Sequence, residues 1–212
     1  MEEKTPGLIL RTRLLTETSL IVHWLTPELG RVAVVAKGAR RPKSPFRGKL
    51  DLFYLADLSF VRSRRSDLHI LREVSIREPH LGLRRDLHLL QQAAYCAQLI
   101  EQTTETETPL PGMYQLMLGL LKFLVTHPPG PVPVFAFEIK LLALAGLQPD
   151  LARTDLSPGT RELLHQFAAA DWSRLGALRL SAEQLVELRQ FLHGFLIYHL
   201  GRIPGGRATA LY

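Results

Sequence analysis

Residues 19–37 read SLIVHWLTPELGRVAVVAK, which is two short apolar runs on either side of a turn. The turn lies at Pro27-Glu28-Leu29-Gly30, where proline and glycine favour a reversal of the chain. In the second run Val32, Val34 and Ala36 share one face, because successive side chains of a strand point to opposite sides. The pattern predicts a β-hairpin with one core face and one face that carries charge at its ends.

Three further strands are predicted around this hairpin, because residues 7–76 alternate short β-like runs with turns. The five runs are Gly7–Leu15, Ser19–Thr26, Arg31–Lys37, Leu50–Arg62 and Asp67–Ile76. In the first run we expect Leu8, Leu10 and Leu14 to line one side, opposite Arg11 and Arg13. Five short antiparallel strands suit a small closed or partly open barrel, since closure hides edges that would otherwise aggregate.

Helical spacing replaces the alternating pattern after Pro79. Helices are predicted at about Leu83–Thr103, Pro111–Thr126 and Val132–Ala145, after an N-cap at Ser157, and from Ser181 to about Gly201. The chain is therefore expected to be of the α+β class, with a β-barrel domain at residues 1–79 and an all-helical domain at residues 80–212.

The positive charge of the chain is concentrated in the predicted barrel. The net charge is +6, and residues 1–80 hold 15 Lys and Arg against 9 Asp and Glu, whereas residues 81–212 hold 11 of each. A basic balance of this kind favours an anionic partner such as nucleic acid or an acidic membrane surface. The single cysteine, Cys96, and the lack of a signal peptide or a long apolar stretch predict a soluble cytoplasmic protein, expected to be nucleoid-associated if it binds DNA.

The strongest charge cluster joins the third and fourth predicted strands, where residues 37–49 hold six cations and no acid. We expect glycines and prolines to keep this loop extended, with the N–H groups of Gly38 and Ala39 available to anions. The candidate phosphate contacts are Arg31, Lys37, Arg40, Arg41, Lys43, Arg47 and Lys49, joined by a second cluster of Arg62, Arg64 and Arg65. Solvated loop charges without a partner are the alternative, but ten cations against two acids between Arg31 and Arg65 favour a polyanion.

Aromatic residues that could stack on bases are also present in the predicted barrel. The candidates are Trp24, Phe46, Phe53 and Tyr54, of which Phe53 and Tyr54 point to opposite faces, so at least one should be core. Phe46, set among the loop cations, is the best stacking candidate, and a hydrophobic plug beneath the loop is an equally good interpretation of it.

Catalytic and cofactor signatures are absent from the sequence, which holds no phosphate-binding loop, dinucleotide-binding glycine pattern, zinc-protease motif or cluster of acids at metal spacing. His193 and His199 are six residues apart and do not form a same-face ligand pair. Cys96 lies on an apolar stripe and is expected to be a small buried hydrophobe. We expect no enzyme activity, no cofactor and no metal.

The sequence also resembles the RecO family of bacterial recombination mediators. The likeness lies in the stretches 17–21, 30–32 and 35–41, in 95–101, and in 137–142 leading to 146–151, with Lys37-Gly38-Ala39-Arg40-Arg41 as its most specific element. It implies an OB-fold barrel followed by a helical domain, and binding to single- and double-stranded DNA. It also implies strand annealing and action with RecR, often with RecF, to help RecA replace single-strand-binding protein, whose acidic tail such proteins can contact.

One departure from the family pattern concerns zinc. Many family members carry a four-cysteine zinc module about where this chain runs from Leu151 to Pro158, and this stretch is short and holds no cysteine. Zinc is therefore predicted to be absent. Two other functions stay open at this stage: an adaptor that acts through its helical domain, and an RNA-binding OB-fold protein.

Overall fold

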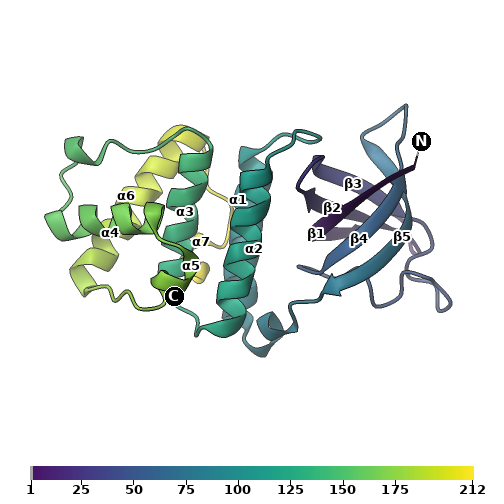
Figure 1. Ribbon diagram of the computed structural model, residues 1–212, viewed down its shortest axis with the longest axis horizontal. Coiled ribbons are helices and arrows are strands. Elements are labelled where there is room, and N and C mark those ends of the chain that lie inside the picture. Colours follow the sequence, from purple (N-terminus) through teal and green to yellow (C-terminus); the bar gives the residue numbers. More distant parts are fainter. Residues whose placement is uncertain (1) are drawn as a thin grey trace. The chain divides into compact units, whose positions relative to one another are not determined.

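The computed structural model describes residues 2–212 (Figure 1). The chain forms two compact units. The first contains the residues up to Leu81 together with Thr104–Gln115, and the second contains Gly82–Thr103 and Leu116–Tyr212. A segment between two helices thus belongs to the same unit as the strands.

The first unit is a closed barrel of five strands, in the order β1-β2-β3-β5-β4. The strands are β1 (Glu2–Leu14), β2 (Leu20–Thr26), β3 (Gly30–Ala36), β4 (Leu55–Val61) and β5 (Leu68–Glu78). Neighbouring strands are antiparallel except β3 and β5, which pair in parallel and close the barrel. The predicted hairpin is confirmed as β2–β3, with Trp24 opposite Val32. This topology and the helical unit that follows are those of an OB-fold barrel with a helical domain, as the sequence predicts.

The barrel core contains the apolar faces predicted for the hairpin, since Val32, Val34 and Ala36 are all buried in it. The prediction for the first strand is partly wrong. Ile9 packs in the barrel core, a bulge between Ile9 and Arg11 shifts the register, and Leu14, beyond the bulge, is 63% exposed. A bulge adds a residue to one strand, and the side chains beyond it change faces.

A short segment after the first long helix, which we call the strap (residues 104–108), lies against the start of β3. The backbone N–H of Glu107 donates to the carbonyl of Arg31 at 2.8 Å. Gly30 adopts a φ of +65°, and a Cβ atom there would lie 2.0 Å from the carbonyl oxygen of Thr108. Only glycine fits this position, because both the backbone angle and the close approach exclude a side chain.

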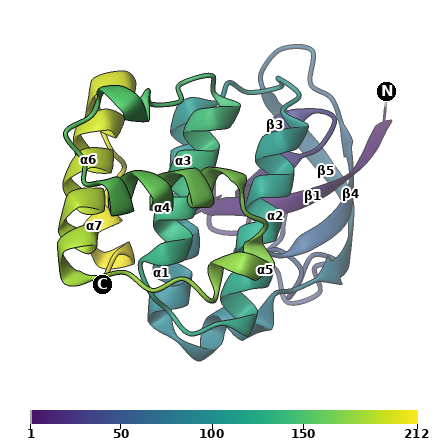
Figure 2. The same ribbon diagram turned by 60° about the vertical axis from the view of Figure 1, so that its left-hand side comes forward.

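The second unit is helical throughout (Figure 2). Its α-helices are α1 (Leu87–Thr103), α2 (Pro111–Thr126), α3 (Val132–Leu144), α4 (Pro158–Ala169), α5 (Trp172–Leu175), α6 (Ala182–Leu200) and α7 (Arg207–Ala210). The first turn of α2 belongs to the barrel unit. The caps at Ser157 and Ser181 are confirmed, the latter as a capping box with Gln184. The first helix begins at Leu87 rather than Leu83, because the 3₁₀ turn η1 (Leu81–Arg85) precedes it.

A buried ion pair lies within the helical unit. The guanidinium of Arg207 on α7 donates to both carboxylate oxygens of Glu138 on α3, at 2.7 and 2.9 Å, and the Tyr95 hydroxyl donates to the same carboxylate at 2.6 Å. Glu138 has no exposed surface, and the Arg207 side chain is 7% exposed. Burial, followed by the Glu138 carboxylate, raises the pKa of Tyr95. The pair fastens the last short helix to the centre of the unit.

Candidate nucleic-acid interface

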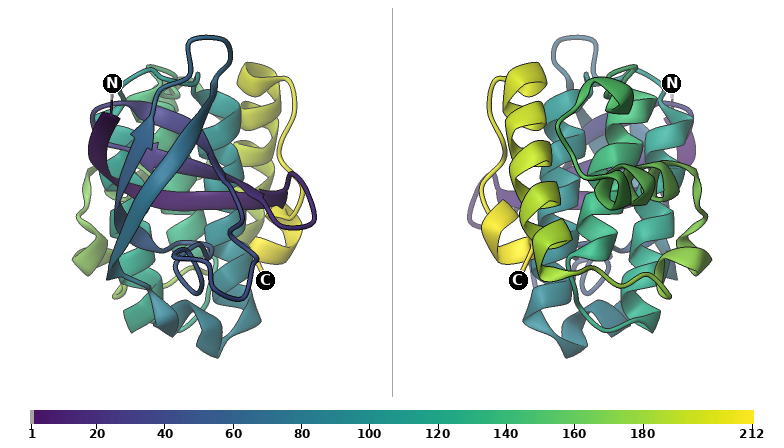
Figure 3. Two further views of the ribbon diagram at one scale, coloured as in Figure 1. Left: turned by 90° about the vertical axis from the view of Figure 1, so that its right-hand side faces the viewer. Right: turned by 90° about the vertical axis from the view of Figure 1, so that its left-hand side faces the viewer.

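The segment between β3 and β4 is a compact coil of turns, drawn without helix or strand in the left view of Figure 3. The N–H of Arg41 donates to the carbonyl of Gly38, that of Ser44 to Arg41, and that of Lys49 to Phe46, each at 3.0 Å. The expectation of an extended loop is therefore wrong, because the backbone satisfies its hydrogen bonds locally. We call residues 37–49 the basic loop.

The backbone N–H groups proposed for anion binding have partners inside the protein. Gly38 donates to the Ser19 hydroxyl at 3.2 Å, and Ala39 donates to the carbonyl of Ala36 at 3.4 Å. The expectation that they remain available to anions is wrong. The basic loop therefore offers side chains, rather than its first backbone amides, to a ligand.

Phe46 is a hydrophobic plug beneath the basic loop. Its side chain is 7% exposed and packs in the barrel core, and Ala39, 8% exposed, joins the same cluster. Of the two interpretations open at the sequence level, the structure supports the plug and excludes the open stacking platform. The plug is buried while the residues around it are exposed, so it holds the charged loop against the barrel.

The cations of the basic loop are solvent-exposed, except Lys49, which is half-buried. Within residues 2–212 none of the six forms an ion pair with a carboxylate. Arg40 donates to the carbonyl of Glu17 at 3.0 Å and Arg47 to that of Pro42 at 3.3 Å, and a carbonyl orients a guanidinium without cancelling its charge. The loop therefore presents a cluster of unneutralised positive charge.

A groove of about 530 Å³, which we call the first groove, runs beside this loop. Three loop arginines line it, namely Arg40, Arg41 and Arg47. Its apolar lining includes Leu20, Leu50 and the half-buried Tyr54. Of the four predicted stacking residues Tyr54 alone is not buried, since Trp24 and Phe53 join Phe46 in the interior. Cations around an apolar floor are what a nucleotide requires, with phosphate on the guanidinium groups and base on the floor.

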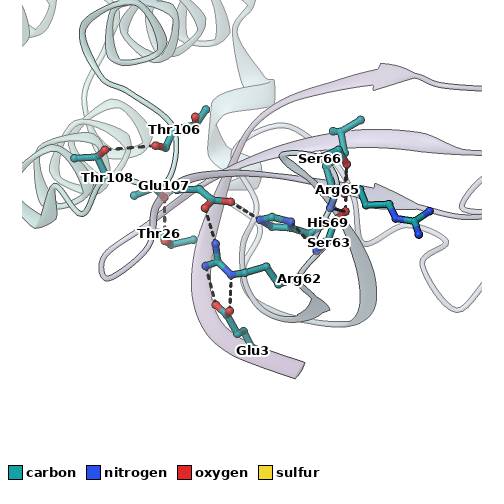
Figure 4. Close-up of polar contacts among 12 residues, drawn as sticks. Glu3, Thr26, Arg62, Ser63, Arg65, Ser66, His69, Thr106, Glu107 and Thr108 are labelled. Carbon is teal, nitrogen blue, oxygen red and sulfur yellow. Dashed lines mark hydrogen bonds and ion pairs between the residues drawn. The ribbon is translucent and has the colours of Figure 1, made fainter. Parts of the chain in front are cut away.

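Arg62, from the second predicted cluster, is held by carboxylates of its own chain (Figure 4). It donates to Glu3 at 2.7 Å and to Glu107 of the strap at 2.5 Å, and its hydrogen bond to the Glu3 carboxylate is the largest cause of the raised pKa of Arg62. The carboxylate of Glu107 also contacts the buried ring of His69 at 2.5 Å. Arg62 is thus placed to bind the strap to the barrel.

The remaining predicted cations also fall into two groups, those with partners inside the barrel unit and those exposed to solvent. Arg31 donates from Nε to the Thr104 hydroxyl at 2.7 Å, and so it also contacts the strap. Arg64 and Arg65 are exposed in the β4–β5 connection, and Arg65 points away from the Arg62 network (Figure 4). The structure therefore separates them from Arg31 and Arg62, whose side chains have partners within the barrel unit.

The barrel face around His23 is also positively charged. Burial, followed by the nearby charges of Arg11, Arg13 and Arg31, lowers the pKa of His23 to about 4. The ring is therefore neutral at neutral pH and adds no charge of its own. Arg11 and Arg13 were not candidate site residues, although their alternation in the first strand placed them on one face.

The helical unit offers no comparable chemistry. Cys96 is fully buried, and burial raises its pKa well above the ordinary thiol value, as expected for a small hydrophobic residue. Among the described residues there is no group of three His, Cys, Asp or Glu side chains placed to hold a metal ion. In the same part of the chain, no helix combines the length and apolar character needed to cross a membrane.

The fold and the site together define a class of protein: an OB-fold barrel with an unneutralised basic loop, followed by a helical domain. Family models identify the family within this class. Residues 1–80 match the model described as recombination protein O N terminal, and residues 84–154 and 152–207 match recombination protein O C terminal.

Individual relatives are similar over most of the chain. DNA repair protein RecO of Bacillus subtilis is 30% identical over 224 residues, covering 91% of this chain and 87% of the relative. That of Bacillus pumilus is 28% identical over 89% of this chain and 86% of the relative, and that of Rhodopirellula baltica is 32% identical over 69% and 54%. The chain belongs to the RecO family of DNA repair proteins.

Proposed function

We propose that this chain is a non-enzymatic recombination mediator that binds single- and double-stranded DNA through the basic loop and anneals complementary strands. The observation that carries the proposal is the set of six loop cations without carboxylate partners, held in place by the buried Phe46 beside the first groove. Cations that neutralise phosphates on two strands lower the repulsion that opposes their approach. No groove contact requires a particular base, so binding is non-sequence-specific.

Family membership is what supports the proposed partner proteins. We infer that the chain acts with RecR and RecF to help RecA replace single-strand-binding protein on DNA, and that it contacts the acidic tail of that protein. Arg64 and Arg65 are proposed as secondary phosphate contacts because they are exposed. Arg31 and Arg62 are proposed to act through the strap they hold.

A salt titration of oligonucleotide binding tests the central claim. For single strands the logarithm of affinity falls with the logarithm of salt by about 0.7 per neutralised phosphate. Replacing Arg40, Arg41 and Arg47 together by alanine should reduce this slope by about 2 and weaken binding about 100-fold at about 0.1 M salt. The matched control replaces Arg153, Arg174 and Arg202, three exposed cations of the helical unit, and should leave the slope unchanged.

The two alternatives make different predictions in the same experiment. An adaptor whose loop only aids solubility would bind no oligonucleotide even at low salt. An RNA-binding protein would bind an RNA strand more tightly than a DNA strand of matched sequence. Annealing of complementary strands, with and without single-strand-binding protein, then separates a mediator from a passive binder.

A further inference from the structure

A second groove lies on the other side of the plug. It has a volume of about 670 Å³ and runs between the basic loop and strands β1, β4 and β5. Phe46 contributes to the lining of both grooves, so the basic loop is the ridge between them. Neither Lys4 nor Arg72, which line the second groove, belongs to the two charge clusters that are visible in the sequence.

The second groove carries an excess of positive charge. Lys4, Lys49 and Arg72 line it, and none of them forms an ion pair within residues 2–212. It also contains two carboxylates, Asp57 and Glu73. Asp57 is neutralised by Arg77 at 2.6 Å, which leaves Glu73 as the opposing charge. Three cations against one uncompensated carboxylate favour an anionic ligand.

Ser59 provides an independent sign of a ligand. It lines the second groove on β4, where it is paired with Lys4 of β1 and Glu73 of β5. The residue is 3% exposed, and its hydroxyl has no hydrogen-bond partner in the described part of the chain. A buried hydroxyl without a partner is uncommon, because folding removes its hydrogen bonds to water and no hydrogen bond within the protein replaces them. A phosphate oxygen in the groove would accept its hydrogen bond.

We propose that the second groove holds a second segment of single-stranded DNA while the first groove holds another, so that one chain carries two strands on opposite sides of the basic loop. The inference rests on the proposed function and extends it to the annealing step. Each DNA segment would contact a different set of cationic side chains. The ridge between the grooves is thin enough for Phe46 to line both. Two strands carried this way meet with part of their charge already neutralised.

Native mass spectrometry with two short, non-complementary single strands tests the proposal, because it counts the strands bound to each chain. The wild type should carry one copy of each strand at saturation. The triple change Lys4→Ala, Lys49→Ala and Arg72→Ala should reduce this to one strand, and should slow annealing of complementary strands about tenfold. The equally charged control at Arg153, Arg174 and Arg202 should keep two strands and the wild-type annealing rate.

Ser59→Ala separates a ligand role from a structural one. Because the hydroxyl has no partner in the protein, its removal should leave the urea midpoint the same or higher. Loss of a donor to phosphate should raise the dissociation constant of the second strand about tenfold, which corresponds to about 1.4 kcal/mol. An unchanged second-strand affinity in this variant, or a wild type that saturates with one strand, would overturn the proposal while leaving the proposed function intact. Failure to bind even a first strand would overturn both.

Discussion

Removal of the Phe46 side chain should weaken DNA binding without changing any charge. Phe46 is buried in the barrel core while the cations on either side of it are exposed. Phe46→Ala leaves a cavity beneath the basic loop and removes its largest apolar anchor. The loop arginines then become mobile in the unbound protein, and binding must order them again.

The structure sets the size of two effects, the loss of folding stability and the loss of DNA affinity. Truncating a buried phenylalanine costs about 3–5 kcal/mol, and we expect the lower end, about 3 kcal/mol, because Phe46 lies at the edge of the core. Ordering a flexible side chain on binding costs about 0.5–1.5 kcal/mol. For the three arginines of the first groove this amounts to about 3 kcal/mol, or about a 100-fold rise in Kd.

Fluorescence anisotropy with a labelled single strand, repeated at several salt concentrations, measures the effect. The affinity should fall while the slope of log affinity against log salt stays at the wild-type value, because the number of cations is unchanged. Phe46→Leu keeps most of the plug, so it should cost less than about 1.5 kcal/mol and bind nearly as the wild type. If Phe46→Ala loses stability in urea yet binds DNA with wild-type affinity, the plug does not organise the interface.

Three further variants test contacts that stabilise the two units. Gly30→Ala should destabilise the barrel by about 2 kcal/mol or more in urea, since it combines a positive φ with a clash against the strap. Arg207→Ala should cost about 3–5 kcal/mol, because it leaves a buried carboxylate without its partner. Arg62 lowers the pKa of Glu3, so Glu3 adds stability above pH 4.5 that is lost as pH falls through its lower folded-state pKa; Glu3→Gln should flatten urea midpoints across that window.

Two of these variants have a simple control. Ala208→Gly, at an exposed site beside Arg207, should have a much smaller effect than the loss of the buried pair. Gly48 also has a positive φ, but no atom lies within 4 Å of the position that a Cβ would take, so Gly48→Ala isolates the cost of the backbone angle from that of the clash. Equal losses at Gly30 and Gly48 would contradict the role given to the strap. A Glu3→Gln variant with the wild-type acid dependence would contradict the ion pair.

The strands were predictable from the sequence because alternation is a local property. The hairpin around Gly30 and the helix Pro111–Thr126 both form as their patterns predict. The prediction fails where the register depends on a partner strand. Leu14 lies beyond the bulge in β1 and is exposed, and no property of the residues around the bulge signals it.

The charged residues also divide into features that the sequence reveals and features that only the fold reveals. A run of cations between two strands is visible in the sequence, so the basic loop could be found. The ion pairs of Arg62 could not be found in this way, because its carboxylate partners lie 59 and 45 residues away along the chain. Lys4 and Arg72 reach one groove through pairing of β1, β4 and β5, and sequence spacing does not reveal such neighbours.

The distribution of charge supports the proposal that the DNA interface lies on the basic loop. Among the cations from Arg31 to Arg65, the structure uses Arg31 and Arg62 to hold the strap, and it leaves the basic loop without carboxylates. Six like charges so close together repel one another, and burial of Phe46 and Ala39 offsets that repulsion in the unbound protein. Phosphate groups beside these side chains would reduce the repulsion directly, because they carry the opposite charge. We therefore expect a polyanion to stabilise the loop more than it would stabilise isolated surface cations, without contacts to any particular base.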